Sequence, residues 1–571
     1  MIKKFKGLFI GFLVVFAVLS GVCMGETEGD GDERSPSEIR KDARERLMGR
    51  LLEKYPEADA DEDGMLSMEE FKAFREKKMR ENFEMLLKEH PEMDINGDGK
   101  LTRKEFAAFR GRKAKKGPEE AKKQVPLAVK KPGKPNFIFI YADDLGYGDL
   151  GCYGSEKNKT PNIDRLAEEG MRFTDFYVTS GVCTPSRSSL MTGCYPRRVD
   201  MHVDSRGLWV LFPNAKKGLN PEEITVAEVL KKEGYATGCV GKWHLGDQKQ
   251  FLPTSQGFDY YYGIPYSNDM NRKKIPLPLL RNEEVIEAPV HQPSVTTDYT
   301  REAVKFIEEN KDKPFFFYLP HTMVHVPLQA SEKFKDKTSN GRYGDALAEV
   351  DWSTGQIMKK LKDLGIDDKT MVIFSSDNGT YRGRGGSNDP LRGFKGNTDE
   401  GSMRVPFVVR YPGKVPEGKV CGELASTLDI LPTFAKLSGG GLPVDRVIDG
   451  KNIWPLMSGQ EGAKSPYEAF YYYHTTQLQA VRSGNWKLIL PLEVKKRGWS
   501  GSREDVPLKL VNLEEDIHED HDVSRKHPEV VKRLKALADK ARADLGDMDK
   551  EGAGQREAGW VEEPTPLLMD K

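Results

Sequence analysis

From residue 136 onward, short apolar runs alternate with stretches in which apolar residues recur at helical spacing. The runs are dense in Val, Ile, Phe and Tyr, which predicts buried β-strands. They fall within NFIFIYADDLGYGDLG, YATGCVGKWH, PFFFYLPH, MVIFSSDNGT and VPFVVRYPG. The predicted helices are 161–170, 225–234, 298–310 and 342–364. This alternation is typical of an α/β domain, in which helices cover a buried sheet.

The pattern changes after about residue 454. The stretch EAFYYYHTTQLQAVRSGNWKLILPL predicts antiparallel strands, and apolar residues at helical spacing predict a helix over 527–545. We therefore expect a large α/β domain at 136–455 that would carry any catalytic site. A smaller α+β subdomain at 456–549 and a flexible tail at 550–571 would follow it.

Two acidic stretches near the N-terminus share one frame, DADEDGMLSMEE (59–70) and DINGDGKLTRKE (94–105). Each carries oxygen side chains at loop positions 1, 3, 5 and 9, a glycine at position 6 and a glutamate at position 12, which is the layout that Ca²⁺ requires. The alternative is a pair of solvated Asp/Gly-rich turns, and two complete matches in tandem argue against it. Residues 44–112 resemble a pair of EF-hands, all α-helical. The implied Ca²⁺ ligands are Asp59, Asp61, Asp63, Met65, Ser67 and Glu70 in the first loop, and Asp94, Asn96, Asp98, Lys100, Thr102 and Glu105 in the second.

The first 25 residues predict a secretory signal peptide, because Lys3, Lys4 and Lys6 precede a short apolar run and small residues. We expect a secreted or periplasmic protein. Lipid anchoring through Cys23 is the less favoured alternative, because Val22 is an awkward residue before a lipidated cysteine. No other segment is apolar and long enough to cross a bilayer.

The charge composition limits which classes of binding partner are expected. The 571 residues carry a formal net charge of −1, which gives no global reason to expect nucleic acid as a partner. Charge is concentrated locally instead, in an acidic linker at 26–43 and a basic, Pro-containing linker at 113–135.

Polar oxygens follow two of the predicted strands. Asp143 and Asp144 end one strand, and Asp377 and Asn378 end another. Each pair alone is more often a turn or helix cap. Functional groups of α/β sheets gather beyond the carboxyl ends of strands, so the two pairs could meet and hold a hard cation such as Ca²⁺ or Mg²⁺.

Cys183 is the third part of this candidate site, beside the two polar pairs. Five cysteines remain after signal cleavage, an odd number for an oxidising compartment, and Cys183 stands in CTPSR followed by SLMTG. This motif, with YATGCVGKWHLG and LRGFKGNTDEGSMRVPF, resembles the type I sulfatases over 136–486, and most closely their arylsulfatase A and N-acetylgalactosamine-6-sulfatase branch. The resemblance implies an alkaline-phosphatase-like sandwich with a mainly parallel central sheet and a smaller C-terminal subdomain. It also implies that Cys183 is oxidised to formylglycine by a maturation enzyme.

The same resemblance implies roles for individual residues. Asp143, Asp144, Asp377 and Asn378 would hold an active-site Ca²⁺ together with the modified Cys183. Arg187 and Lys242 would orient the nucleophile, and His244 would take its proton when sulfate leaves. His325 and Lys395 would contact sulfate and protonate the departing alcohol. His321 is at least as well explained as a structural histidine, and His202 and Arg392 are candidates for the sugar pocket only.

These features predict a secreted sulfatase that hydrolyses sulfate monoesters of carbohydrates or aryl alcohols. Two alternatives stay open: a phosphomonoesterase or phosphodiesterase of the same superfamily, and a non-catalytic calcium-binding surface protein. The sequence does not identify the sugar, the sulfated position, exo or endo action, or the oligomeric state.

Overall fold

The computed structural model describes residues 133–491 and 506–569, with six further residues between 61 and 77. The chain divides into two compact units, Met1–Val129 and Lys130–Lys571. In the first unit, Glu70 accepts hydrogen bonds from the backbone N–H groups of Asp61 (3.3 Å) and Ser67 (2.9 Å), which joins positions 3, 9 and 12 of the first predicted calcium loop. The remaining predicted loop ligands, the signal peptide and most of both linkers lie outside the described residues.

The second unit is built on a ten-stranded sheet of order β12-β2-β11-β10-β1-β9-β5-β6-β7-β8. Its centre is parallel: β1 pairs with β10 and β9, and β5 pairs with β9 and β6, whereas β11, β2, β7 and β8 make antiparallel pairs. The strands are β12 (Lys419–Cys421), β2 (Met171–Phe173), β11 (Phe407–Arg410), β10 (Thr370–Ser376), β1 (Asn136–Ala142), β9 (Phe315–Pro320), β5 (Ala236–Val240), β6 (Tyr260–Gly263), β7 (Leu279–Arg281) and β8 (Glu284–Glu287).

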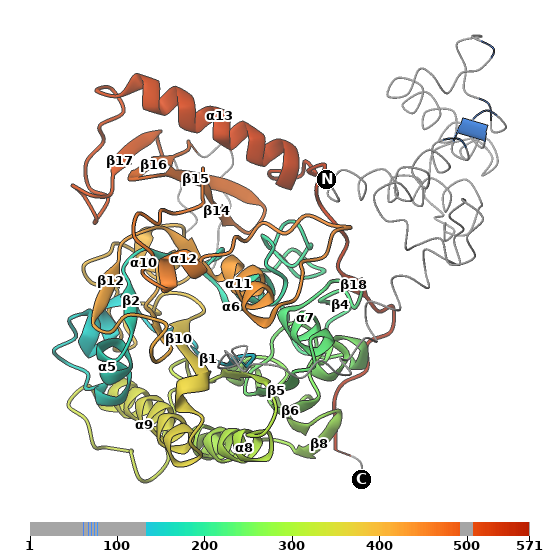
Figure 1. Ribbon diagram of the computed structural model, residues 1–571, viewed down its shortest axis with the longest axis vertical. Helices are drawn as coiled ribbons and strands as arrows, with labels where there is room; N and C mark the ends of the chain where they lie inside the picture. The colour runs from blue at the N-terminus through green and yellow to red at the C-terminus, as the bar shows by residue number, and fades with distance from the viewer. Residues whose placement is uncertain are drawn as a thin grey trace, which may run out of the picture. The chain divides into compact units, whose positions relative to one another are not determined.

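Helices cover both faces of this sheet, with the central strands between them (Figure 1). Side chains of β1 alternate, so that Phe137 and Phe139 join one buried cluster and Ile138 and Ile140 join the other. The first cluster lies under α6 (Cys183–Thr192), α7 (Val226–Lys232) and α11 (Ile430–Ser438); the second lies under α5 (Pro161–Glu168), α8 (Val295–Glu309) and α9 (Gly341–Asp363). This confirms the predicted mainly parallel α/β sandwich.

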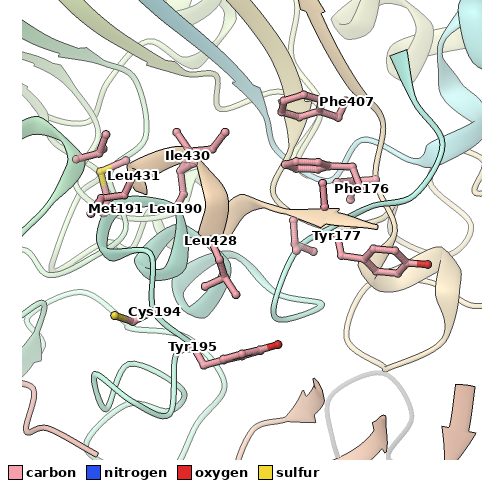
Figure 2. Close-up of a cluster of buried hydrophobic side chains, with 14 of the residues drawn as sticks. Phe176, Tyr177, Leu190, Met191, Cys194, Tyr195, Phe407, Leu428, Ile430 and Leu431 are labelled. Carbon is pink, nitrogen blue, oxygen red and sulfur yellow. The ribbon is translucent and has the colours of Figure 1, made fainter. Parts of the chain in front are cut away.

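Helix α6 is buried along its whole length although most of its residues are polar. Its apolar residues Leu190 and Met191 lie beside Leu428, Ile430 and Leu431 (Figure 2). Two of its hydroxyls bond to the helix itself, since Ser188 donates to the carbonyl of Pro185 (2.7 Å) and Thr192 to that of Ser188 (2.8 Å), whereas Thr184 donates to the carbonyl of His244 (3.0 Å). Internal hydrogen bonds of this kind remove most of the cost of burying a polar helix.

A four-stranded antiparallel sheet forms the C-terminal subdomain, and α13 lies beside it (Figure 1). Its elements are β14 (Phe470–His474), β15 (Gln477–Ser483), β16 (Trp486–Ile489), β17 (Lys509–Asn512) and α13 (Pro528–Leu545). Buried ion pairs join it to the body, between Lys487 and Glu400 at 2.9 Å and between Arg482 and Asp175 at 2.7 Å. Lys487 also lies 2.8 Å from Glu519 of the same subdomain.

The last residues do not form the flexible tail that we expected for 550–571, because 550–569 run back along the body. Strand β18 (Gly559–Trp560) pairs antiparallel with β4 (Lys217–Gly218), and Arg556 forms an ion pair with Glu223 at 2.6 Å. Gln248 and the backbone of Thr565 exchange two hydrogen bonds. The segment has no apolar periodicity, so its docking depends on partners more than 300 residues away that the local sequence does not reveal.

The smaller elements are α10 (Glu400–Met403), α12 (Trp454–Met457), β3 (Phe176–Tyr177) and β13 (Ala425–Ser426). Within the described ranges, no helix is both long and apolar enough to span a bilayer.

Candidate active site

The carboxyl ends of β1 and β10 lie side by side, because Ala142 and Ser376 are partners in the parallel register. Asp143 and Asp144 follow the first strand, and Asp377 and Asn378 follow the second. The Asn378 amide donates to Asp144 at 2.7 Å, and the Asp144 backbone N–H donates to Asp377 at 3.2 Å. The two polar pairs therefore contact each other, as predicted, and all four side chains are buried.

Helix α6 brings Cys183 and Arg187 to the same edge, since residues four apart share a helix face. The Cys183 Sγ lies 3.5 Å from Asp143 Oδ1 and 3.5 Å from Lys395 Nζ. Arg187 donates two hydrogen bonds to Asp377 Oδ2, from Nε (3.0 Å) and Nη2 (2.7 Å). Burial and the Asp143 carboxylate raise the pKa of the Cys183 thiol, so the unmodified thiol is protonated at neutral pH.

The end of β5 supplies Lys242 and His244. Gly241 is required here, because its φ is 137° and a Cβ would lie 1.9 Å from the carbonyl oxygen of Pro320 at the end of β9. Lys242 Nζ then lies 2.5 Å from Asp143 Oδ2 and donates to Ser267 at 3.1 Å. His244, at φ 63°, donates from Nε2 to the carbonyl of Leu211 (2.9 Å).

His325 and Lys395 complete the cluster from the opposite side. His325 Nε2 lies 3.7 Å from Asp144 Oδ2, and its Nδ1 is 3.0 Å from the side-chain oxygen of Asn268. Lys395 Nζ lies 2.5 Å from Asp144 Oδ1. Burial, with Lys395 next in importance, lowers the pKa of His325 to about 3, so this imidazole is uncharged at neutral pH.

With this geometry in place, comparison with known proteins identifies the chain. The Sulfatase family model matches residues 135–440, more than half of the sequence. The chain belongs to the sulfatase family. It is a sulfuric ester hydrolase, and the predicted resemblance is confirmed. A second model, "N-sulphoglucosamine sulphohydrolase, C-terminal", matches 395–543, and the EF hand model matches 57–74 and 92–109.

Known relatives and solved structures support the same family assignment. Arylsulfatase A of Homo sapiens is 41% identical over 392 residues, which cover 63% of this chain and 75% of the relative. N-acetylgalactosamine-6-sulfatase of Canis lupus familiaris is 37% identical over 387 residues, covering 63% and 72%. A Bacteroides thetaiotaomicron 6S-sulf structure, from work on glycosaminoglycan metabolism, has a TM-score of 0.65 at 30% identity and covers 72% of this chain and 99% of its own. Ps i-CgsB in complex with k-i-k-neocarrahexaose has a TM-score of 0.62 at 32% identity, covering 71% and 92%.

The oxygen groups of this sulfatase fit a hard cation. Among the described residues, Asp144 Oδ2 and Asn378 Oδ1 are buried without a hydrogen-bond partner. Burial and the neighbouring Asp143 carboxylate raise the pKa of Asp377 to about 6, a repulsion that a bound cation would relieve. Three carboxylates and an amide oxygen are the donors that Ca²⁺ prefers. Asp143, Asp144, Cys183 and His325 also place one ligand atom each within 4.8 Å of one another, which brings the sulfur to the edge of the same site.

Other histidines and arginines stand apart from this cluster. His321 is fully buried, and its ring makes no hydrogen bond in the described part of the chain, as fits a core position. His202 lies near Arg197 and Asp200 instead, and exposed Arg392 donates to the carbonyl of Glu519.

Sequence reasoning assigned no role to Ser267 and Asn268. Ser267 accepts from Lys242 and lies 3.5 Å from His325 Nδ1, and Asn268 contacts the same imidazole nitrogen. Both follow β6 at the edge where the other strand ends gather, so the strand-end rule applied to YSNDM would have found them.

Proposed function

We propose that this sulfatase hydrolyses sulfate monoesters of carbohydrates, using a formylglycine derived from Cys183 beside a bound Ca²⁺. One observation carries the proposal: Cys183 opens a buried helix with its Sγ 3.5 Å from both a carboxylate of the cation site and the ammonium group of Lys395. A group at this position lies between the charges that bind a cation and the charges that bind an anion.

Asp143, Asp144, Asp377 and Asn378 are the proposed Ca²⁺ ligands. When bound, the cation would withdraw charge from the sulfate group, and formylglycine would supply an oxygen nucleophile as its hydrate. Arg187 and Lys242 contact Asp377 and Asp143 and thereby hold both carboxylates in place.

The remaining residues handle charge and protons around the sulfate ester. Lys395 places a positive charge on the side of Cys183, where it offsets the charge of sulfate oxygens. His325 is the proposed proton donor to the leaving alkoxide, because the negative charge of a bound sulfate ester would raise its pKa and protonate the ring. His244 is the proposed acceptor of the proton that is released when sulfate leaves, since its Nδ1 makes no hydrogen bond with any described residue.

Replacing His325 by glutamine tests the leaving-group role. A sugar alkoxide needs a proton on departure, whereas 4-nitrophenolate leaves unaided, so we expect kcat on a sugar sulfate to fall about 10²–10⁴-fold. The loss on 4-nitrophenyl sulfate should be at least about tenfold smaller. Steady-state sulfate release measures both. Equal losses on the two substrates would contradict proton donation by His325.

The names of the relatives support the substrate class. They include an N-acetylgalactosamine-6-sulfatase, a 6S-sulf protein and a structure in complex with k-i-k-neocarrahexaose. We infer a sulfated carbohydrate as substrate, with aryl sulfates as convenient assay compounds.

The proposal extends to location and maturation. The basic and apolar N-terminus supports export to a secreted or periplasmic location, with a formylglycine-generating enzyme as the partner that modifies Cys183. The EF-hand pair is proposed to hold structural Ca²⁺ in two loops, because calcium outside the cell saturates modules of modest affinity.

Chelation separates the two kinds of calcium site. We expect EGTA to abolish sulfate release by wild-type protein and to lower its thermal midpoint, and added Ca²⁺ to restore both. The double variant Glu70→Gln, Glu105→Gln should keep its activity in Ca²⁺, whereas Asp144→Asn should not. Full activity in EGTA would refute a calcium-dependent active site.

A further inference from the structure

Thr184, which directly follows Cys183 in α6, is buried, and its hydroxyl lies between two segments that are distant in the sequence. The hydroxyl donates to the carbonyl of His244 at 3.0 Å and accepts from the Leu211 N–H at 3.2 Å. The direction of both bonds is fixed, because a carbonyl oxygen only accepts and a backbone N–H only donates. Thr184 therefore joins the start of α6 to both segments.

Leu211 also contacts the side chain of His244. The Leu211 carbonyl accepts a hydrogen bond from His244 Nε2 at 2.9 Å, so Nε2 is the nitrogen that carries the ring proton. Burial, with Lys242 next in importance, lowers the pKa of His244, which leaves the ring uncharged and places a lone pair on Nδ1. Nδ1 makes no hydrogen bond with any described residue. The contact with Leu211 thus decides which nitrogen is able to accept a proton.

The backbone of His244 is in an uncommon conformation. Its φ of 63° lies in the left-handed region, which few residues with a side chain adopt. Its N–H donates to the carbonyl of Pro265 at 3.1 Å, and its own carbonyl accepts from Thr184. Among the described residues, Thr184 is the only partner of that carbonyl and of the Leu211 N–H. Loss of the hydroxyl would leave two backbone groups of buried residues unpaired.

The Leu211 segment is joined to the His244 turn at a second point. Asp247, which is buried and lies three residues after His244, accepts hydrogen bonds from the backbone N–H groups of Asn214 and Ala215, the latter at 3.1 Å. The segment that carries the carbonyl acceptor therefore stays beside the turn that carries the imidazole. What the Asp247 bonds leave open is the register of the Leu211 carbonyl against the ring, and the Leu211 N–H bond fixes it.

We propose that Thr184 is a positioning residue whose hydroxyl sets the orientation and the tautomer of His244. The inference rests on the proposed function, in which His244 accepts the proton that is released when sulfate leaves. A base needs a lone pair that points at the proton it takes. A ring released from Leu211 can turn over or carry its proton on Nδ1, and either change removes the lone pair from its place. Thr184 acts through His244 and is not itself a catalytic residue.

The first test observes the ring and needs neither formylglycine nor turnover. Proton–nitrogen NMR correlation reads the tautomer of His244 in the full chain with Cys183→Ala and isotope-labelled histidine, and His244→Gln assigns its signals. We expect protonated Nε2, retained on adding Thr184→Ser, and a mixture of tautomers with Thr184→Val. The matched control is Thr192→Val, a buried threonine of α6 that donates to Ser188 and should change nothing. Protonated Nδ1 at the outset, or unchanged His244 signals in Thr184→Val, would overturn the proposal.

The second test measures kcat and KM for 4-nitrophenyl sulfate per mole of formylglycine, which mass spectrometry of the Cys183 peptide quantifies. His244 acts after the alcohol has left, so Thr184→Val should lower kcat and KM together by about tenfold or more, keep kcat/KM and give a burst of 4-nitrophenol. Thr184→Ser and Thr192→Val should match wild type.

Two contrary results have different meanings. A loss in kcat/KM as large as the loss in kcat would mean general damage to the site and overturn the positioning role of Thr184. An altered His244 ring with unchanged kcat would support the positioning role and overturn the proton-accepting role of His244 in the proposed function.

Discussion

Cys183→Ala should abolish sulfate release while leaving the protein folded. If the residue is the precursor of the nucleophile, its loss costs on the order of 10⁴-fold or more in kcat, because no other group replaces a missing nucleophile. The fold should tolerate the change, since alanine is the best helix former and Cys183 is the first residue of α6. Sulfate release and far-UV circular dichroism measure the two effects.

Cys421→Ser is the matched control for this prediction. Cys421 lies on the edge strand β12, is half-buried and does not reach the site, so its variant should retain activity near that of wild type. A Cys183→Ala protein that keeps more than about a hundredth of wild-type kcat would contradict a nucleophile at this position.

Lys487→Met should give the largest loss of stability. The Lys487 ammonium is fully buried between Glu400 and Glu519 and donates to the carbonyl of Thr398 at 2.9 Å. Its removal takes the ion-pair partner from buried Glu519 and the strongest of three cations from buried Glu400, which costs about 3–5 kcal/mol of unfolding free energy. Urea unfolding of the full chain measures it. Exposed Lys540→Met, whose ion pair with Glu468 lies in solvent, should change stability by under about 1 kcal/mol.

The same network sets a pH dependence. Burial alone would raise the pKa of Glu400, but Lys487, Arg482 and Arg404 outweigh it and lower the pKa from 4.5 to about 2. A depressed carboxyl pKa stabilises the folded state above the ordinary value, and this contribution is lost as pH falls from about 4.5 toward 2. Wild-type stability should therefore drop across that window, and Glu400→Gln should flatten the drop. If the Glu400→Gln variant loses stability below about pH 4.5 as steeply as wild type, Glu400 is not the source of that loss.

Much of the site follows from local sequence. Asp143 and Asp377 stand directly after apolar runs, and the parallel pairing of such strands brings their ends together whatever the loops do. Cys183 and Arg187 share a helix face by their spacing alone. GKWHLG is equally local, because Gly241 permits the close approach to β9 that delivers Lys242.

What the sequence could not show depends on contacts between distant residues. Arg556 reaches Glu223 across 333 positions, so the docked C-terminal segment looked like a tail. Ser267 and Asn268 are ordinary polar residues whose role appears only when Lys242 and His325 lie beside them. The hairpin tip at His474 and the loop at Trp209 line one small recess, and these two segments also meet only in the folded chain.

Mass spectrometry of protein from its native host tests the central claim most directly. The peptide that contains Cys183 should show the mass loss of thiol-to-aldehyde conversion, and the extent of conversion should track specific activity across preparations. An unmodified thiol at Cys183 in fully active protein would contradict the account, because the formylglycine nucleophile that it requires would be missing.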